Sequence, residues 1–359
     1  MSRLGKPTLL ASALALVLTL AGTLLSVPTE AQAATPSSRF PLADPNTVLA
    51  KDGTYVTYGT NVGATVGPRC GAPTGVKLFV PFLNHGSGDS VSMSDCAAGD
   101  ALPGGPGAWT GDTEVWAPGV VEFNGTYFMY YTATKKDSGQ KCIGLATSGG
   151  AKSPFTVRGE WACPAGGRWA IDADPFVAGG KLYVVYRDDA ITTWPDTGIS
   201  VVQVGSDGFA LWNTRRDLMK STDLNWESTN MSGETRVIEN PSIFVGGEGH
   251  YYLTFSGNNW RSARYSTGIA DCGTSPLPSS RCRLLQDGAN QPYFGYTGAG
   301  GLGPYRGLPG NHAGPGGMDV FYTSGNRRCV VWHWYDTAAD RRHPIIGELK
   351  LNSGGFYVE

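Results

Sequence analysis

The sequence predicts an all-β fold, a five-bladed β-propeller, and three observations lead to this prediction. One short pattern recurs along the chain: a leading residue, an apolar run, a turn that contains glycine, and a strand rich in tyrosine. The leading residues lie 56 to 80 residues apart, which is the length of a four-stranded unit with its loops. The 51 glycines, the 23 prolines and an aromatic content of 11% are typical of many short strands joined by turns.

Each copy of the pattern has nearly the same length. The leading residue precedes the first tyrosine of the strand that follows by 11 residues, or by 12 in the fourth copy, and in the fifth copy it precedes Val330 by 11. The pairs are Asp44 and Tyr55, Trp116 and Tyr127, Asp172 and Tyr183, Glu239 and Tyr251, and, in a weaker fifth copy, Asp319 and Val330. The apolar patterns that follow predict β-strands at 54–58, 127–131, 182–186, 251–255 and 330–332. In the first four copies a proline follows within three residues, which places the leading residue at the mouth of a strand.

The first 33 residues are predicted to be a secretory signal peptide. A positively charged start precedes an apolar stretch at residues 9–27, and Ala31-Gln32-Ala33 has the small-x-small pattern that signal peptidase cleaves. A membrane anchor is the alternative, but Pro28 and the cleavage pattern follow the apolar stretch, and no basic cluster does. The mature protein is expected to comprise residues 34–359 as one propeller domain and to be secreted to the extracellular space.

The charge and hydropathy of the chain narrow the choice of partners. A net charge of −2 and the lack of a Lys/Arg cluster argue against a nucleic-acid partner, because phosphate binding needs a concentrated basic surface. No segment after the leader is apolar for long enough to cross a bilayer, so no membrane partner is expected. The sequence therefore favours a neutral ligand. The protein is expected to be a monomer.

Seven cysteines follow the predicted signal peptide, and export would place them where disulfides persist. They contain no CxxC pair, which argues against a zinc site. The sequence alone does not fix the connectivity, and pairing of neighbours is the simplest arrangement. It joins Cys70 with Cys96, Cys142 with Cys163 and Cys272 with Cys282, and it leaves Cys329 unpaired.

Three of the leading residues are acids, and three carboxyl groups close together would indicate a catalytic site. Equivalent positions of propeller blades meet at the central axis, so Asp44, Asp172 and Glu239 are expected to lie close together. Hydrolysis of a glycosidic bond needs one carboxylic acid and one carboxylate. A third acid has a use, because nearby negative charge raises the pKa of the proton donor. In the third blade the 11-residue count selects Asp172, whereas alignment on proline selects Asp174, which stays a competitor.

Several short motifs occur in a fixed order along the mature chain. They are residues 43–45 with 55–60, 116–118 with 130–133, 143–148 with 154–155, 170–172 with Phe176, and 239–242 with 251–253. In this order and spacing they resemble glycoside hydrolase family 43, the five-bladed propeller enzymes that act on arabinose- and xylose-containing polysaccharides. The resemblance covers essentially the whole mature chain.

The resemblance implies roles for the three acids: Asp44 as general base, Asp172 as the residue that orients and tunes the acid, and Glu239 as general acid. It also implies inversion of the anomeric centre, which needs base and acid about 6.5 to 9.5 Å apart. Arabinofuranosidic linkages of plant hemicellulose and pectin side chains are favoured over xylosidic ones as the substrate. Trp116 has two open interpretations, stacking on an apolar sugar face or packing between blades.

The sequence departs from the family pattern in two blades. Ala173 follows Asp172 where the family has proline. Family members often open the fifth blade with a Gly-His pair, and in arabinanases this histidine helps to hold calcium. Residues 314–319 read Gly-Pro-Gly-Gly-Met-Asp, and the nearest histidine, His312, comes about five residues too early. No cofactor is expected to be required, and the fifth-blade sequence does not support a structural calcium ion.

Two rival interpretations stay open. Residues 44–46 are also similar to those of retaining fructan-cleaving propellers, although Ala173 stands where these have arginine and no cysteine follows Glu239. A secreted, non-catalytic carbohydrate-binding propeller would need no pair of acid and base. The loops at 86–106 and 295–310 carry no motif that distinguishes arabinose from xylose, or exo from endo cleavage.

Overall fold

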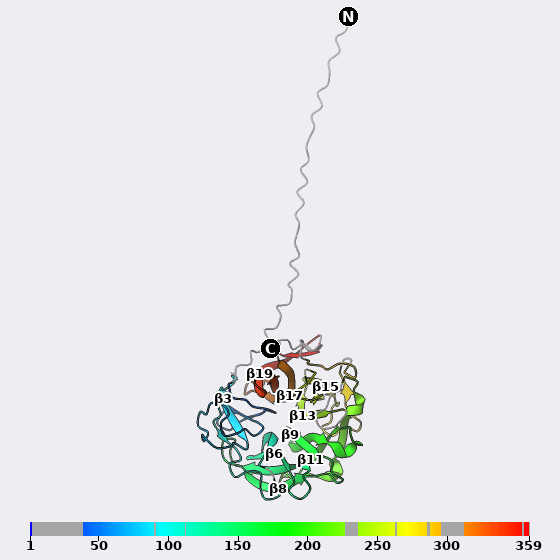
Figure 1. Cartoon of the computed structure of the whole chain (residues 1–359). Helices are drawn as coiled ribbons and strands as arrows, with labels where there is room; N and C mark the ends of the chain where they lie inside the picture. The colour runs from blue at the N-terminus through cyan, green and yellow to red at the C-terminus, as the bar shows by residue number, and fades with distance from the viewer. Residues whose placement is uncertain are drawn as a thin grey trace. The chain divides into compact units, whose positions relative to one another are not determined.

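The computed structural model describes Met1 and residues 39–89, 91–111, 113–226, 236–262, 264–285, 288–295, 312–353 and 355–358. Within them lie five antiparallel sheets of four strands each, and the sheets are arranged around a common axis as the blades of a propeller (Figure 1). This confirms the predicted fold class. Apart from Met1, the predicted signal peptide and its cleavage pattern lie outside the described residues.

Each blade is a meander in which consecutive strands are neighbours. The first blade contains β1 (Asn46–Leu49), β2 (Thr54–Tyr58), β3 (Pro81–Ser87) and β4 (Gly99–Asp100). The second contains β5 (Trp116–Phe123), β6 (Thr126–Thr134), β7 (Lys141–Ser148) and β8 (Thr156–Ala162), and the third contains β9 (Ala170–Ala178), β10 (Lys181–Asp188), β11 (Gly198–Val204) and β12 (Arg216–Lys220). The fourth contains β13 (Ile238–Val245), β14 (Tyr251–Gly257), β15 (Ser266–Asp271) and β16 (Arg283–Leu284). The fifth contains β17 (His312–Tyr322), β18 (Arg328–Asp336), β19 (Arg341–Asn352) and β20 (Gly355–Val358).

The five predicted tyrosine-rich or apolar strands are confirmed as parts of β2, β6, β10, β14 and β18. The described helices are three short 3-10 turns, η1 (Asp189–Ile191), η2 (Trp212–Thr214) and η3 (Ser221–Asp223), and no described helix could span a membrane.

Near the start of its innermost strand, each blade has a residue with a left-handed φ at an equivalent position. These residues are Asp44 (φ 50°), Ala117 (40°), Asp172 (54°), Asn240 (46°) and Gly317 (61°). In all five blades, the residue 11 positions after this left-handed residue belongs to the second strand of the same blade. The spacing of 11 is thus constant in the structure, whereas the spacing from the leading residues was 11 or 12. Pairing with the second strand shifts at this point in blades two to five, which marks a β-bulge.

The five leading residues predicted from the sequence are not all at equivalent positions relative to the bulge. Trp116 and Glu239 come one residue before the left-handed position of their blades, and Asp319 comes two residues after it. A bulge re-aims the side chains on either side of it, so residues at neighbouring positions can both face the axis.

Buried tyrosines fill the spaces between blades. Tyr58 and Tyr131 belong to one apolar cluster that joins the first and second blades. Their hydroxyl groups donate hydrogen bonds to backbone carbonyls, Tyr58 to Ala151 at 2.5 Å and Tyr131 to Pro106 at 2.6 Å. A buried hydroxyl needs such a partner, so each ring fixes a loop of the adjoining blade as well as its packing.

The first and fifth blades close the ring. The Thr47 N–H of β1 donates to Asp319 Oδ2 of β17 at 2.6 Å, and the Ser324 N–H donates to the Tyr55 hydroxyl at 3.0 Å. Tyr55 also packs against Phe321, with ring centroids 5.9 Å apart. Closure protects the edges of the sheets and holds the five strand mouths at one end of the axis.

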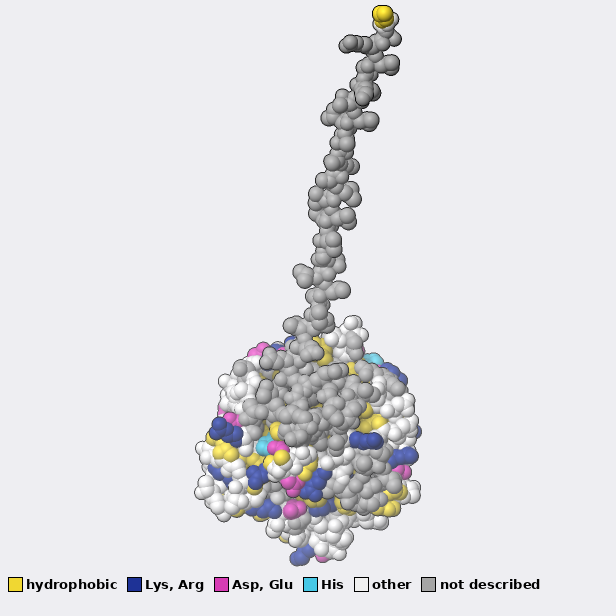
Figure 2. Space-filling model, turned by 45° about the horizontal axis from the view of Figure 1, so that its top comes forward, with side chains coloured by type: hydrophobic (Ala, Val, Ile, Leu, Met, Phe, Trp, Pro, Cys, Tyr) yellow, Lys and Arg dark blue, Asp and Glu magenta, His cyan; other side chains and the backbone are white. Residues whose placement is uncertain are grey.

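Charged side chains are distributed over the surface. On the face in Figure 2, described Lys and Arg side chains are interspersed with acidic ones and do not gather into a basic patch. This distribution agrees with the expectation from composition that the ligand is neutral.

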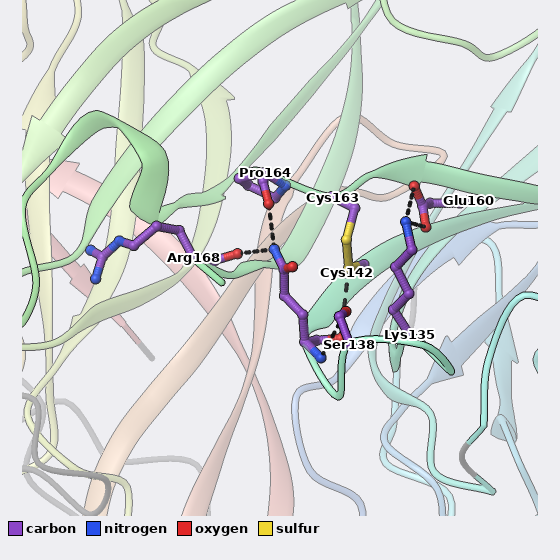
Figure 3. The surroundings of a disulfide bond; sticks show 8 residues. Lys135, Ser138, Cys142, Glu160, Cys163, Pro164 and Arg168 are labelled. Carbon is purple, nitrogen blue, oxygen red and sulfur yellow. Dashed lines mark hydrogen bonds and ion pairs between the residues drawn. A yellow bond between two sulfur atoms is a disulfide. The ribbon is translucent and has the colours of Figure 1, made fainter. Parts of the chain in front are cut away.

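The predicted disulfides are confirmed: Cys70–Cys96, Cys142–Cys163 and Cys272–Cys282 form, and Cys329 is free and buried. The second of them joins β7 to the segment that leads into β9 (Figure 3). The side chain of Gln140 holds the same segment by donating to the carbonyls of Pro164 and Arg168. The residue that follows Arg168 is a tryptophan, so this segment bears on the candidate site.

Candidate active site

A cavity of about 300 Å³ opens at the strand mouths. It is lined by Asp44, Trp116, Trp169, Ile171, Asp172, Arg187, Val237, Glu239, Asn240, Asn258, Asn259, Trp260 and Arg342. All three predicted acids and Trp116 are among these residues. Because side chains from the second, third, fourth and fifth blades and the segment before β1 meet here, the cavity depends on the closed ring.

Asp44 lies where its carboxylate is stabilised as an anion. Its Oδ1 accepts hydrogen bonds from Arg342 Nη1 at 2.7 Å and Asn240 Nδ2 at 2.9 Å, and its Oδ2 accepts one from Thr60 Oγ1 at 2.5 Å. Burial alone would raise the pKa of Asp44, but the Arg342 guanidinium and these hydrogen bonds hold it below its usual value. Asp44 is therefore ionised at any ordinary working pH.

Asp172 lies in the opposite electrostatic environment. Burial, followed by the negative charges of Glu239 and Asp44, raises the pKa of Asp172 well above its usual value. Its backbone N–H donates to Thr132 Oγ1 at 3.1 Å, and its Oδ2 accepts from the Asn240 N–H at 3.1 Å. Because Asp172 and Glu239 repel each other as anions, the pair keeps a proton to a higher pH than an exposed carboxyl would.

Besides Asp172, Glu239 lies near Arg187 and Tyr265. Its Oε2 lies 3.6 Å from Arg187 Nη1, and its Oε1 accepts a hydrogen bond from the Tyr265 hydroxyl at 3.4 Å. Arg187 is buried and is held by Asp189 through two hydrogen bonds of 2.9 Å. Since Asp189 already neutralises this guanidinium, Glu239 faces a matched ion pair rather than a lone cation.

The site therefore combines an ionised carboxylate, Asp44, with a pair of acids, Asp172 and Glu239, that retains a proton. A model of "Glycosyl hydrolases family 43" matches residues 39–282. The chain belongs to this family. The match includes Asp44, Asp172 and Glu239, and the family assignment makes the protein a glycoside hydrolase.

Curated relatives of this family 43 chain are arabinan hydrolases by name. "Probable arabinan endo-1,5-alpha-L-arabinosidase A" of Aspergillus flavus is 24% identical over 308 residues, which cover 82% of each chain. The protein of the same name from Aspergillus fumigatus is 26% identical over 270 residues, which cover 71% of this chain and 75% of its relative.

Solved structures share the fold at low sequence identity. A thermostable family-43 glycoside hydrolase has a TM-score of 0.68 at 19% identity, with 91% of this chain and 96% of that chain covered. An alpha-L-arabinofuranosidase from Lactobacillus brevis has a TM-score of 0.63 at 17% identity, with coverage of 90% and 96%. A Cellvibrio cellulosa alpha-L-arabinanase complexed with arabinohexaose has a TM-score of 0.59 at 13% identity, with coverage of 90% and 96%.

Asn240 connects the three acids of this family 43 hydrolase. It follows Glu239 directly, its backbone N–H binds Asp172, and its side-chain amide binds Asp44. Its left-handed φ of 46° allows both groups to point into the cavity. In the sequence Asn240 stands out only as part of a motif, because a linking role leaves no mark in spacing.

Tryptophans line the cavity of the family 43 chain beside the acids. A cation lies against each ring: Lys141 Nζ is 3.6 Å from the Trp116 centroid, and the guanidinium carbons of Arg187 and Arg342 are 5.6 Å and 4.5 Å from those of Trp169 and Trp260. Such contacts orient the rings, and a tryptophan face can stack on the apolar face of a sugar. Trp169 and Trp260 lie outside the repeated strand mouths, so the repeat did not reveal them.

Asp174, the competitor of Asp172, does not line the main cavity. It lines a smaller cavity of about 40 Å³ further along the axis, together with Asn46, Ser242 and Asp319. Its Oδ1 accepts from Asn46 Nδ2 at 3.0 Å, and burial raises the pKa of Asp174 to about 7. Asp44 and Asp172 line both cavities, whereas of these two cavities Asp174 lines only the smaller one, together with the fifth-blade Asp319.

The described residues include one group of side chains of the kind that binds metal ions. Among the residues that the structure describes, the one group of three or more metal-type side chains within reach of each other is Cys142, Glu160 and Cys163. Two of its members form a disulfide, so they offer no thiolate. Calcium prefers six to eight oxygen ligands, and this set supplies one carboxylate. His312, considered for the fifth blade, lies in β17, but its side chain is outside the described residues.

Proposed function

We propose that the protein is a secreted hydrolase of α-L-arabinofuranosidic linkages in arabinan-type polysaccharides, with Asp44 as general base and Glu239 as general acid. One observation carries the proposal: the cavity holds an Asp44 whose pKa is lowered beside an Asp172–Glu239 pair that retains a proton. Environments that push carboxyl pKa values apart define which group accepts and which donates a proton.

In the proposed reaction Glu239 gives its proton to the glycosidic oxygen as the bond from that oxygen to the anomeric carbon breaks. Asp44 takes a proton from a water molecule, whose oxygen forms the new bond to the anomeric carbon from the opposite side. Asp172 stays out of bond making. Because it lies beside Glu239, joint ionisation of the two carboxyl groups is disfavoured, and one proton stays on the pair for Glu239 to donate. The products are a free alcohol and a sugar with inverted configuration.

Arabinan as the substrate is supported by two findings. The curated relatives carry the name arabinan endo-1,5-alpha-L-arabinosidase, and they align with most of this chain. The cavity is walled by tryptophans and hydrogen-bonding side chains, which suits a neutral, hydroxylated ligand. No cofactor enters the proposed reaction.

Secretion is proposed from the signal pattern of residues 1–33 and from the three disulfides of the mature residues 34–359, which persist in oxidising compartments. The mature propeller is proposed to act as a monomer, without a membrane or nucleic-acid partner.

The proposal predicts the anomer of the first product. Purified residues 34–359 should be offered linear arabinan, arabinoxylan, an aryl α-L-arabinofuranoside and an aryl β-xyloside, with products followed by proton NMR from the first minutes. Hydrolysis of arabinan with initial release of the β-anomer is expected. Initial release of the α-anomer would point to a retaining mechanism. Activity on the xyloside alone would contradict the assignment of arabinan as the substrate. Binding without turnover would favour a carbohydrate-binding propeller.

Replacing Arg342 by glutamine is expected to move the acidic limb of the kcat/KM profile to higher pH. The base works only when ionised, so activity falls as the pH drops through the pKa of Asp44, and without Arg342 burial raises that pKa. The measurement is the pH profile on an aryl arabinofuranoside. Arg261→Gln is the matched control, because Arg261 also contacts Trp260 but binds Asp340 rather than Asp44. An unmoved acidic limb in Arg342→Gln would show that Asp44 is not the base.

A further inference from the structure

We propose that Tyr265 and His333 form a stacked pair that positions the acid and the base of the active site, Glu239 and Asp44. The inference rests on the proposed function and assigns positioning residues to it. The two rings lie nearly parallel, with centroids 5.6 Å apart and an angle of 18° between their planes. Both side chains are fully buried, and they come from the fourth and fifth blades.

His333, on β18, holds the base through its backbone. Its Nδ1 accepts a hydrogen bond from the Asp44 N–H at 3.2 Å. Burial lowers the pKa of His333 to about 3, so the ring is neutral, and the donating Asp44 N–H assigns the ring proton to Nε2 and leaves Nδ1 as the acceptor. Asp44 has a left-handed φ of 50° and lies before β1 begins, so no sheet ladder fixes it. The hydrogen bond to His333 supplies that restraint.

Tyr265 holds the acid directly. Its hydroxyl donates to Glu239 Oε1 at 3.4 Å and also interacts with Ser256. Burial, then the negative charges of Glu239 and Asp44, raises the pKa of Tyr265 well above its usual value, so the hydroxyl keeps its proton. Ser256 Oγ in turn accepts from the Gly317 N–H at 2.7 Å, which ties this end of the pair to the fifth blade.

The fifth blade makes room for the pair with two glycines. A Cβ on Gly316 would lie 2.0 Å from Tyr265 Cε1, and a Cβ on Gly317 would lie 2.8 Å from His333 Cε1 and Nδ1. Gly317 occupies the position that Asp44 and Asp172 occupy in their own blades. The fifth blade therefore has no side chain at its axial position, Gly317. The rings of Tyr265 and His333 occupy the space that such a side chain would need.

The stacked pair consequently contacts both reacting residues, Glu239 at its carboxyl group and Asp44 at its backbone N–H. An inverting hydrolase needs its base and acid held at a separation that admits one water molecule. A displacement of about 1 Å at a reacting group can lower the rate on the order of a hundredfold. Loss of either polar contact of the pair should thus reduce kcat more than it changes KM.

The test uses substitutions that separate hydrogen bonding from packing. His333→Phe keeps an aromatic ring but removes the acceptor, and His333→Asn keeps an acceptor near the place of Nδ1 but removes the ring. We expect His333→Phe to lower kcat about ten- to hundredfold with little change in KM. His333→Asn should retain a clearly higher kcat than His333→Phe. The reverse order would show that the ring acts by packing alone.

Tyr265→Phe completes the test at the acid end. It keeps the stacked ring and removes the hydroxyl, so kcat on arabinan should fall about tenfold or more. An aryl arabinofuranoside with a good leaving group needs little protonation, so it should restore most of the rate for Tyr265→Phe and little of it for His333→Phe. Equal restoration in both variants would contradict the assignment of one ring to each carboxyl group.

Tyr130→Phe is the matched control. Tyr130 is equally buried, and its hydroxyl donates to the Gly208 carbonyl at 2.8 Å away from the cavity, so this variant should lose thermal stability but not kcat. If His333→Phe fails to fold, the leaving-group comparison on Tyr265→Phe decides. An inactive wild-type protein would defeat the proposed function itself. An active wild-type protein whose Tyr265 and His333 variants lose only stability would defeat the stacked pair alone.

Discussion

Glu239→Gln is expected to lower kcat on arabinan by about 10² to 10⁴-fold, the usual contribution of a positioned proton donor. Glutamine keeps the shape of the side chain and can still accept the Tyr265 hydrogen bond, but it has no proton to give to the leaving oxygen. Substrate binding should persist, because the tryptophan walls and Asp44 are unchanged. The loss should therefore appear in kcat, with KM equal to or lower than that of the wild type.

The measurement compares arabinan with an aryl arabinofuranoside whose leaving group departs as an anion. The second substrate should recover much of the rate in Glu239→Gln, because its bond breaks without protonation. Glu114→Gln is the control: Glu114 accepts from Trp116 Nε1 at 3.2 Å at an exposed position near the cavity, and glutamine can also accept there. Hydrolysis of arabinan by Glu239→Gln at the wild-type rate would exclude Glu239 as the acid.

The sequence repeat predicted the propeller and the acids for the same physical reason. A blade is a local unit, so its turns, strands and strand-mouth residue recur at fixed spacing, and the axis brings equivalent positions together. This reasoning reached Asp44 and Asp172 directly. It reached Glu239 with an offset of one residue, because a β-bulge lets the residue before the left-handed position face the cavity as well.

The partners of the acids could not be predicted in this way. Arg342 and His333 reach Asp44 from β19 and β18, across about 290 residues of chain, and they belong to strands that carry no strand-mouth pattern. Their contacts exist only because the ring closes. The sequence did show that the fifth blade was unusual, with glycines where a histidine was expected. It could not show that His333 of the next strand, β18, lies beside Gly317, where that histidine was expected.

The pKa values of the acids follow from these unpredicted partners. Asp44 and Asp172 have the same side chain and both are buried, yet Arg342 lowers the pKa of the first, while the charges of neighbouring acids raise that of the second. Sequence spacing places acids together but leaves their roles undecided. The surrounding cations and amides supply the difference on which the assignment of base and acid depends.

Asp44→Asn should lower kcat/KM by about 10² to 10⁴-fold, because an amide cannot take a proton from water. Asparagine tolerates a left-handed φ better than most residues, so the backbone at this position should be preserved. Its side chain can still accept from Thr60, and its backbone N–H can still bind His333. The loss is therefore expected to reflect chemistry rather than a collapsed site.

The pH profile tests whether this loss concerns the base. In the wild type, activity falls on the acidic side as Asp44 gains a proton, and in Asp44→Asn this acidic limb should disappear while the alkaline limb, set by the acid, is retained. Asp52→Asn is the control in the same blade: Lys152 lowers the pKa of Asp52 to about 2, but Asp52 lies on an exposed turn away from the cavity. If Asp44→Asn kept both limbs with a reduced rate, water activation would have to be assigned to another carboxylate, and Asp172 would be the first to examine.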